Sequence, residues 1–295
     1  MIARTAGVAL LALALFACAA PPPAASPPPG DPRIDLARRA AGLAFARGQF
    51  DQAVRLYAEA LEHAQARDDG AALGDLGYEL AVAQLRRGDP EASLAASAAA
   101  RAELRRHGSP SFPELDLVEA VALQRAGHPD QAERAAAVLI GAGGPVARRA
   151  RFLLGLIAAE RGDAGAVSVQ LAALGAPAEA EWHADREELA ARLSALNADH
   201  GAAGTGFLAA ADARREVSDY PGMARALAGA AASAVAAGDP AGAAALYLRA
   251  GRSQILAGGG SARAQDWLST AERLARATGE RTVLAAIEAL RARRP

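Results

Sequence analysis

The sequence predicts an all-α protein, an α-solenoid of stacked antiparallel helix pairs that follows a signal peptide and a proline-rich linker. Alanine, the strongest helix former, supplies more than a quarter of the 295 residues, whereas aromatic residues supply 4%. Turns centred on glycine recur between helical stretches at nearly constant intervals. Because aromatic and β-branched residues are scarce, a β-rich fold is not expected.

The overall composition excludes several classes of protein. The 32 basic residues, all arginine, balance 33 acidic residues, so the dense basic surface of a nucleic-acid-binding protein is missing. Half of the residues are apolar, which argues against a disordered chain. A single cysteine excludes an intramolecular disulfide framework and a zinc site built from cysteines.

Residues 1–17 are interpreted as a secretory signal peptide. Arg4 gives a positive N-terminal region, and the apolar stretch from Gly7 to Ala17 is shorter than the roughly 20 residues that span a bilayer. The sequence Leu15-Phe16-Ala17-Cys18 resembles the lipobox of bacterial lipoproteins, in which the cysteine becomes the lipid anchor. The alternative is an ordinary cleavage site near Ala17, with secretion to the periplasm.

The resemblance to lipoproteins also implies a location. In that family an aspartate after the cysteine favours retention in the inner membrane, and this chain has Ala19 there. The expected product is an outer-membrane lipoprotein that faces the periplasm and contacts the membrane through Cys18. Residues 18–32 then form a Pro/Ala-rich tether, which favours extended polyproline II structure and cannot build a core.

Four turn glycines mark an internal period after the tether. Gly48, Gly88, Gly127 and Gly162 follow one another at intervals of 40, 39 and 35 residues. Five residues after each glycine stands a small or short residue, and nine residues after it stands a second packing position. These two positions are Ala53 and Tyr57, Ser93 and Ser97, Ala132 and Ala136, and Val167 and Leu171. Each period therefore predicts one helix pair.

This pattern resembles the tetratricopeptide repeat (TPR) over about residues 34–174. The best match is AAGLAFARGQFDQAVRLYAEAL, in which Gly48, Phe50, Ala53, Tyr57 and Ala60 occupy family positions. Later units depart from it, because Pro90 and Pro129 replace the turn aromatic and the spacing exceeds the usual 34 residues. We assign residues 33–197 to TPR-like repeats.

The C-terminal part, residues 204–295, is predicted to contain degenerate repeats and a polar capping helix. A helix is expected over 178–197, followed by a Gly-rich break at 198–206. Further helices are expected over 206–217, 222–237, 240–257, 262–277 and 280–293. Gly238 and Gly259 both fit the repeat phase, but they lie too close together to be internal turns of successive units.

The TPR resemblance implies a concave groove lined by the first helix of each pair, suited to a peptide or helix of a partner. Possible groove-lining residues are Arg38, Phe45, Tyr78, Arg86, Arg125, Arg149 and Phe152. One hypothesis is that the four arginines pair with carboxylates of a bound peptide. The alternative, which we favour, is that they are solvated and pair with acidic residues of their own chain.

No catalytic or cofactor-binding signature stands out, so no enzyme activity, cofactor or metal is predicted. Asp185 and Glu187 lie in the densest polar cluster, which we interpret as a solvated helix face with an ion pair, a weak metal site being the alternative. The glycine-rich stretches at 141–144, 201–206 and 258–261 have no P-loop lysine and are interpreted as turns. Arginine doublets such as Arg214-Arg215 are interpreted as solvated faces.

The expected function is a non-enzymatic scaffold or adaptor that binds envelope proteins in the groove. Two alternatives remain: a self-associating structural protein of the envelope, and an envelope enzyme with a catalytic region in residues 204–295. The sequence identifies neither the partner nor the oligomeric state.

Overall fold

The computed structural model describes residues 31–175, 180–256 and 262–292. Contacts divide the chain into residues 1–31 and residues 32–295, and the fold described below belongs to the second unit. The predicted signal peptide, Cys18 and nearly all of the tether lie outside the described residues, as does the glycine run at 258–260.

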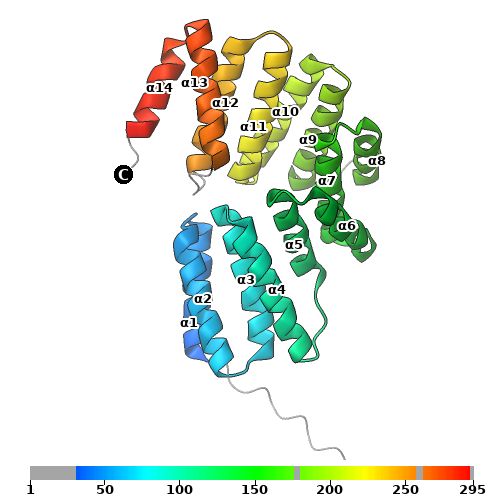
Figure 1. The fold of residues 1–295 in the computed structure, drawn as a ribbon, viewed down its shortest axis with the longest axis vertical. Helices are drawn as coiled ribbons and strands as arrows, with labels where there is room; N and C mark the ends of the chain where they lie inside the picture. The colour runs from blue at the N-terminus through cyan, green and yellow to red at the C-terminus, as the bar shows by residue number, and fades with distance from the viewer. Residues whose placement is uncertain (1–30, 176–179, 257–261, 293–295) are drawn as a thin grey trace, which may run out of the picture. The chain divides into compact units, whose positions relative to one another are not determined.

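Fourteen α-helices and one short 3-10 helix make up the described residues, so the all-α prediction is confirmed there (Figure 1). In the first half these are α1 Pro32–Ala46, α2 Phe50–Ala66, α3 Gly70–Arg87, α4 Pro90–Arg106, α5 Pro113–Arg125, α6 Pro129–Leu139, η1 Ile140–Ala142, α7 Gly144–Glu160 and α8 Ala164–Leu174. The second half contains α9 Ala180–Leu196, α10 His200–Glu216, α11 Tyr220–Ala236, α12 Pro240–Leu256, α13 Ala262–Thr278 and α14 Arg281–Ala292.

The helices pack in chain order, each against the next, as antiparallel pairs (Figure 1). The four predicted turn glycines, at 48, 88, 127 and 162, all have positive φ and end the first helix of a pair. Glycine suits this place because it enters the left-handed region without the steric cost that other residues meet. The predicted period is therefore a period of helix pairs.

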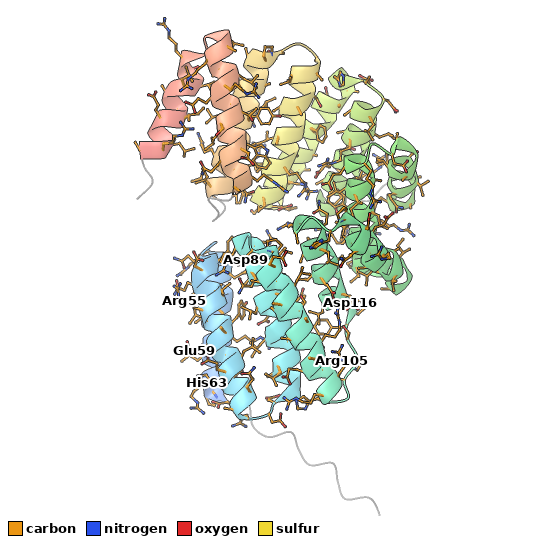
Figure 2. The ribbon with its side chains drawn as sticks, viewed as in Figure 1. Arg55, Glu59, His63, Asp89, Arg105 and Asp116 are labelled. Atoms are coloured by element: carbon orange, nitrogen blue, oxygen red, sulfur yellow. The ribbon has the colours of Figure 1, made fainter. Side chains whose placement is uncertain are left out.

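Aspartate starts many of the helices. Asp89, which is labelled in Figure 2, accepts a hydrogen bond at 3.0 Å from the backbone N–H of Ala92 and caps α4. The same bond is made at the starts of α3, α8, α10, α11 and α12 by Asp69, Asp163, Asp199, Asp219 and Asp239. Each of these six aspartates follows a residue with positive φ. A left-handed residue followed by an N-capping aspartate is thus the recurrent turn of this chain.

Small residues bring the helices close together. The predicted positions five residues after each turn glycine, Ala53, Ser93, Ala132 and Val167, are all fully buried. Ser93 uses its hydroxyl to donate a hydrogen bond of 2.8 Å to the carbonyl of Ala81 on the preceding helix. The apolar clusters continue from α1 to α14 because each helix shares buried residues with its neighbours.

The predicted Gly-rich break at 198–206 is wrong. Only the turn at 197–199 is irregular, and the glycines at 201, 204 and 206 lie inside α10. A Cβ atom added to Gly206 would lie 3.0 Å from the Cβ of Ala191 on α9. This glycine therefore marks a close approach of two helices, and Asp199 starts the helix in front of it.

The second half is also more regular than predicted. Ala198, with a φ of 61°, takes the place of the turn glycine between α9 and α10. Gly238 is the turn between α11 and α12, and Gly279 is the turn between α13 and α14, whereas Gly259 lies outside the described residues. The pairs α9–α10, α11–α12 and α13–α14 thus continue the period of the first four pairs.

No helix in the described ranges is long and apolar enough to cross a membrane.

The close approach at Gly77 gives a test of the packing. A methyl group on Gly77 of α3 would lie 2.5 Å from the Cβ of Ala100 on α4, and 3.2 Å from its Cα. We expect Gly77→Ala to lower the free energy of unfolding by about 1–3 kcal/mol, because overpacking outweighs the helix propensity of alanine.

Gly201 is the matched control, because the nearest atom to its added Cβ is 3.9 Å away. Gly201→Ala should raise the free energy of unfolding by about 0.5–1 kcal/mol. Urea unfolding followed by circular dichroism measures both. A stabilised Gly77→Ala variant would show that α3 and α4 are not in close contact.

Candidate functional site

A groove of about 550 Å³, a size typical of ligand sites, lies among the described helices. Its walls come from α3, α5, α7, α9, α11 and α13, the first helices of their pairs, from Arg214 of α10, and from the turn between α10 and α11. The lining residues are Leu85, Arg86, Leu117, Val118, Val121, Gln124, Arg125, Arg149, Phe152, Leu153, Leu156, Glu160, Arg192, Arg214, Val217, Ser218, Asp219, Pro221, Gly222, Arg225 and Arg263.

The lining combines apolar walls with arginines. Leu117 and Val121 of α5 face the groove, as do Phe152 and Leu156 of α7. Seven of the lining residues are arginines, and two are acidic. These arginines fall into two sets that differ in their partners.

The first set surrounds two buried carboxylates of α9. Asp185 and Glu188 are both fully buried. Arg214 of α10, which is only 2% exposed, donates hydrogen bonds to Asp185 at 2.6 Å and to Glu188 at 3.0 Å. It also donates to Asp219, the N-cap of α11, at 2.7 Å. One guanidinium thereby links three carboxylates of α9 and the α10–α11 turn.

Three further arginines complete this cluster from neighbouring helices. Arg225 of α11 binds both oxygens of Glu188, at 2.7 and 2.8 Å, and Arg192 donates to Glu188 at 3.0 Å. Arg149 of α7 donates to Asp185 at 2.9 Å. We call these seven residues the buried ionic cluster: Asp185, Glu188, Asp219, Arg149, Arg192, Arg214 and Arg225. It joins α7, α9, α10 and α11 beneath the groove.

Aromatic rings hold the arginines in place. The guanidinium groups of Arg214 and Arg225 lie 5.3 and 5.6 Å from the ring centroid of Phe152. Arg149 lies 4.8 Å from the ring centroid of Trp182. Contacts of this kind are favourable because the ring face is electronegative. Phe152 and Trp182 therefore orient the charged groups as well as pack.

The cluster shifts the pKa values of its carboxyls. Burial raises the pKa of Glu188, but the charges of Arg225, Arg214 and Arg192 outweigh it and hold this pKa well below its usual range. The pKa of Asp219 is also lowered, because Arg214 and Arg225 outweigh its burial. For Asp185 burial dominates and raises the pKa. Glu188 is thus the carboxylate that the arginines stabilise most strongly as an anion.

The second set consists of Arg86 on α3, Arg125 on α5 and Arg263 on α13. Arg125 donates a hydrogen bond of 3.1 Å to the carbonyl of Leu85. Within the described ranges none of the three has a carboxylate at ion-pair distance. Crowding by the surrounding protein and the charges of Arg225, Arg86 and Arg263 lower the pKa of Arg125, although its side chain remains exposed. These cations repel one another across the groove.

A smaller cavity of about 290 Å³ adjoins the groove at Arg192, which lines both. Four of its ten lining residues are alanines, at 159, 195, 232 and 236, and Phe207 also lines it.

The predicted groove residues separate into two groups. Arg86, Arg125, Arg149 and Phe152 come together in the groove. Arg38, Phe45 and Tyr78 do not line it.

The three outlying residues pack or pair within the first helices. Arg38 binds Glu79 through hydrogen bonds of 2.6 to 3.1 Å. Phe45 packs edge-on against Phe50 with ring centroids 5.4 Å apart, and Tyr78 packs in the same way against Phe112 at 5.5 Å. Arg38 and Arg149 therefore pair with acidic residues of their own chain, Glu79 and Asp185.

Two sequence interpretations of the charged residues are wrong. Arg214 belongs to a doublet that was interpreted as solvated, yet it is buried. Asp185 was placed on a solvated helix face, yet it is buried because α7 and α10 cover it with Arg149 and Arg214. No group of His, Cys, Asp and Glu among the described residues could hold a metal ion.

Sequence reasoning did not single out Arg192, Arg225 or Arg263. Arg192 stands four residues after Glu188, and this spacing on one helix is the only local signal of the cluster. Arg225 and Arg263 come from helices whose place in the repeat was not recognised.

Comparisons with known proteins do not establish a family. No family model matches the chain, and no curated protein matches it either. Among solved structures it is similar to a tetratricopeptide repeat protein from Parabacteroides merdae, with 14% identity over 87% of this chain and 98% of that chain and a TM-score of 0.48. It is also similar to the TPR2AB domain of yeast Sti1 in complex with pHSP90, with 16% identity over 87% of this chain and 96% of that chain and a TM-score of 0.35.

The buried ionic cluster predicts a large effect of one substitution. Arg214→Leu removes the guanidinium that Asp185, Glu188 and Asp219 share, and leaves the buried Asp185 with Arg149 as its remaining partner in the buried ionic cluster. We expect the free energy of unfolding at pH 7 to fall by about 3–5 kcal/mol. Arg105→Leu, at an exposed position on α4 (Figure 2), is the control and should have little effect.

The loss of free energy of unfolding in Arg214→Leu should be smaller at acid pH than at pH 7. In the wild type, Glu188 and Asp219 have folded-state pKa values below their ordinary 4.5 and 3.8, so their stabilisation is present above those values and is lost as the pH falls. In Arg214→Leu the carboxyls are stabilised less as anions, and the pKa of Asp185, which burial already raises, should rise further because Arg214 no longer lowers it. Protonation of Asp185 near pH 4 then removes part of the variant's loss of stability. Urea unfolding at pH 7 and near pH 4 measures both proteins, and a deficit independent of pH would contradict the assignment.

Proposed function

We propose that the chain is a non-enzymatic scaffold or adaptor that binds a segment of a partner protein in the groove between α3 and α13. The observation that carries the proposal is the groove itself, which the first helices of successive pairs line with both apolar and cationic side chains. An extended peptide or a helix fits such a surface, because apolar side chains supply burial and polar groups set the register.

The site favours binding over catalysis. Four of its seven arginines are neutralised by carboxylates in the buried ionic cluster, and the other three are cations without a carboxylate at ion-pair distance among the described residues. Arginine stays protonated at neutral pH, so it serves poorly as a general acid or base. The groove therefore offers recognition of shape and charge.

The proposal includes anchoring in the outer membrane. The sequence Leu15-Phe16-Ala17-Cys18 supports lipidation of Cys18, and Ala19 supports the outer membrane, with the helical unit facing the periplasm. The partners would then be envelope proteins. Secretion to the periplasm without an anchor is the alternative.

Filling the groove tests partner binding without changing charge. Val121 lines the groove, so Val121→Trp should obstruct it and reduce the partner recovered after crosslinking in cells by about tenfold or more. Val169→Trp is the matched control, because Val169 is 62% exposed on α8 outside the groove. Equal recovery with both variants would contradict a role for the groove, once circular dichroism shows that both are folded.

Lipidation of Cys18 is tested by metabolic labelling with a fatty-acid analogue. We expect the wild-type protein to be labelled and to sediment with the outer membrane, and Cys18→Ser to lose the label. An unlabelled wild-type protein would contradict the anchor while leaving the groove proposal intact.

A further inference from the structure

Arg86, Arg125 and Arg263 differ from the other arginines of the groove. Arg149, Arg192, Arg214 and Arg225 are already paired with Asp185, Glu188 or Asp219. The three others have no carboxylate partner in the part of the chain that the structure describes, although they line the same groove. The charges of these three arginines are therefore available to a ligand.

We propose that Arg86, Arg125 and Arg263 form one anion-binding site, which receives successive acidic side chains of the partner segment. The proposal rests on the proposed function and names the chemistry of the partner. Guanidinium groups bind carboxylates through paired, charge-assisted hydrogen bonds, which suits them to this task.

The three arginines act together because they share one region of the groove. The charges of Arg86 and Arg263 both act on Arg125 and contribute to its lowered pKa. Asp219 offsets only part of this repulsion, because the pKa of Arg125 stays lowered, so a bound polyanion would relieve the remainder. The hydrogen bond from Arg125 to the carbonyl of Leu85 holds one of the cations at the wall of α3.

The neighbouring walls distinguish a peptide from a free ion or a membrane surface. Leu117, Val121 and Leu156 line the same groove, so a ligand that fills it must present apolar groups beside its negative charges. A small inorganic anion has no such groups, and a flat bilayer surface does not enter a recess. A segment in which acidic and apolar residues alternate satisfies both requirements.

The site also joins parts of the chain that are distant in sequence. Arg86 lies in the last turn of α3 and Arg125 ends α5, whereas Arg263 lies at the start of α13. A segment bound to all three therefore bridges the first and last helices of the groove. Specificity for acidic partners should be lost in steps as the arginines are replaced.

The test is fluorescence anisotropy with the purified protein and a labelled peptide in which Glu alternates with Leu and Ser. The comparison peptide carries Gln at every Glu position. We expect the acidic peptide to bind more tightly, with an affinity that falls as salt is raised, because the arginine charges are partly screened. Arg263→Gln and Arg125→Gln should each weaken binding by about tenfold or more.

Arg105→Gln removes the same charge from an exposed position outside the groove and should leave the affinity unchanged. Thermal unfolding checks that all variants are folded, which is expected because the replaced side chains have no ion pair to lose. Equal binding of the two peptides, or unchanged affinity in Arg263→Gln and Arg125→Gln, would overturn the proposal. So would inorganic phosphate bound as tightly as the acidic peptide.

The two proposals fail separately. If Val121→Trp abolishes partner capture while the arginine variants bind the acidic peptide normally, the groove binds a partner but not through this site. If Val121→Trp has no effect on capture, the groove itself is not the binding surface.

Discussion

Close contact between helices at alanine and glycine positions is the constraint on which the fold depends. An isolated helix pair cannot bury its apolar face, so each pair of this chain must pack against the next. Ala100 lies against Gly77, and Ala191 lies against Gly206, at distances that leave no room for a further methyl group. Larger side chains such as Leu73, Leu115 and Leu227 then supply most of the buried apolar area.

The buried ionic cluster is the exception to this apolar packing. Burying Asp185 and Glu188 costs solvation, which hydrogen bonds to Arg149, Arg214 and Arg225 offset. Such a cluster adds little net stability, but it requires one specific arrangement of the helices, because each carboxylate oxygen needs its donor. We infer that it fixes α7, α9, α10 and α11 relative to one another. The arginines used within it are thereby unavailable to a ligand, which leaves the three unpaired arginines to define what the groove accepts.

Much of the fold was predictable from local signals, whereas the site was predictable only in part. Turn glycines and small residues repeat along the chain, so periodicity alone gives the helix pairs of the first half. The turn at Ala198 was missed because alanine rarely has a positive φ, although Asp199 after it carries the N-cap signal seen at Gly88-Asp89. Periodicity identifies the helix on which Arg38 or Arg214 lies, but not the distant carboxylate that a long side chain reaches. Glu79 and Glu188 are such partners, supplied by tertiary packing.

The central claim, that the groove faces a partner, is tested most directly by site-specific photocrosslinking in cells. A benzophenone amino acid would replace Gln124, which lines the groove, and in a second protein Val138, which is 79% exposed on α6 outside it. The account predicts a discrete crosslinked protein from position 124 and none from position 138. A partner crosslinked at position 138 and absent at position 124 would place the binding surface on another face and contradict the account.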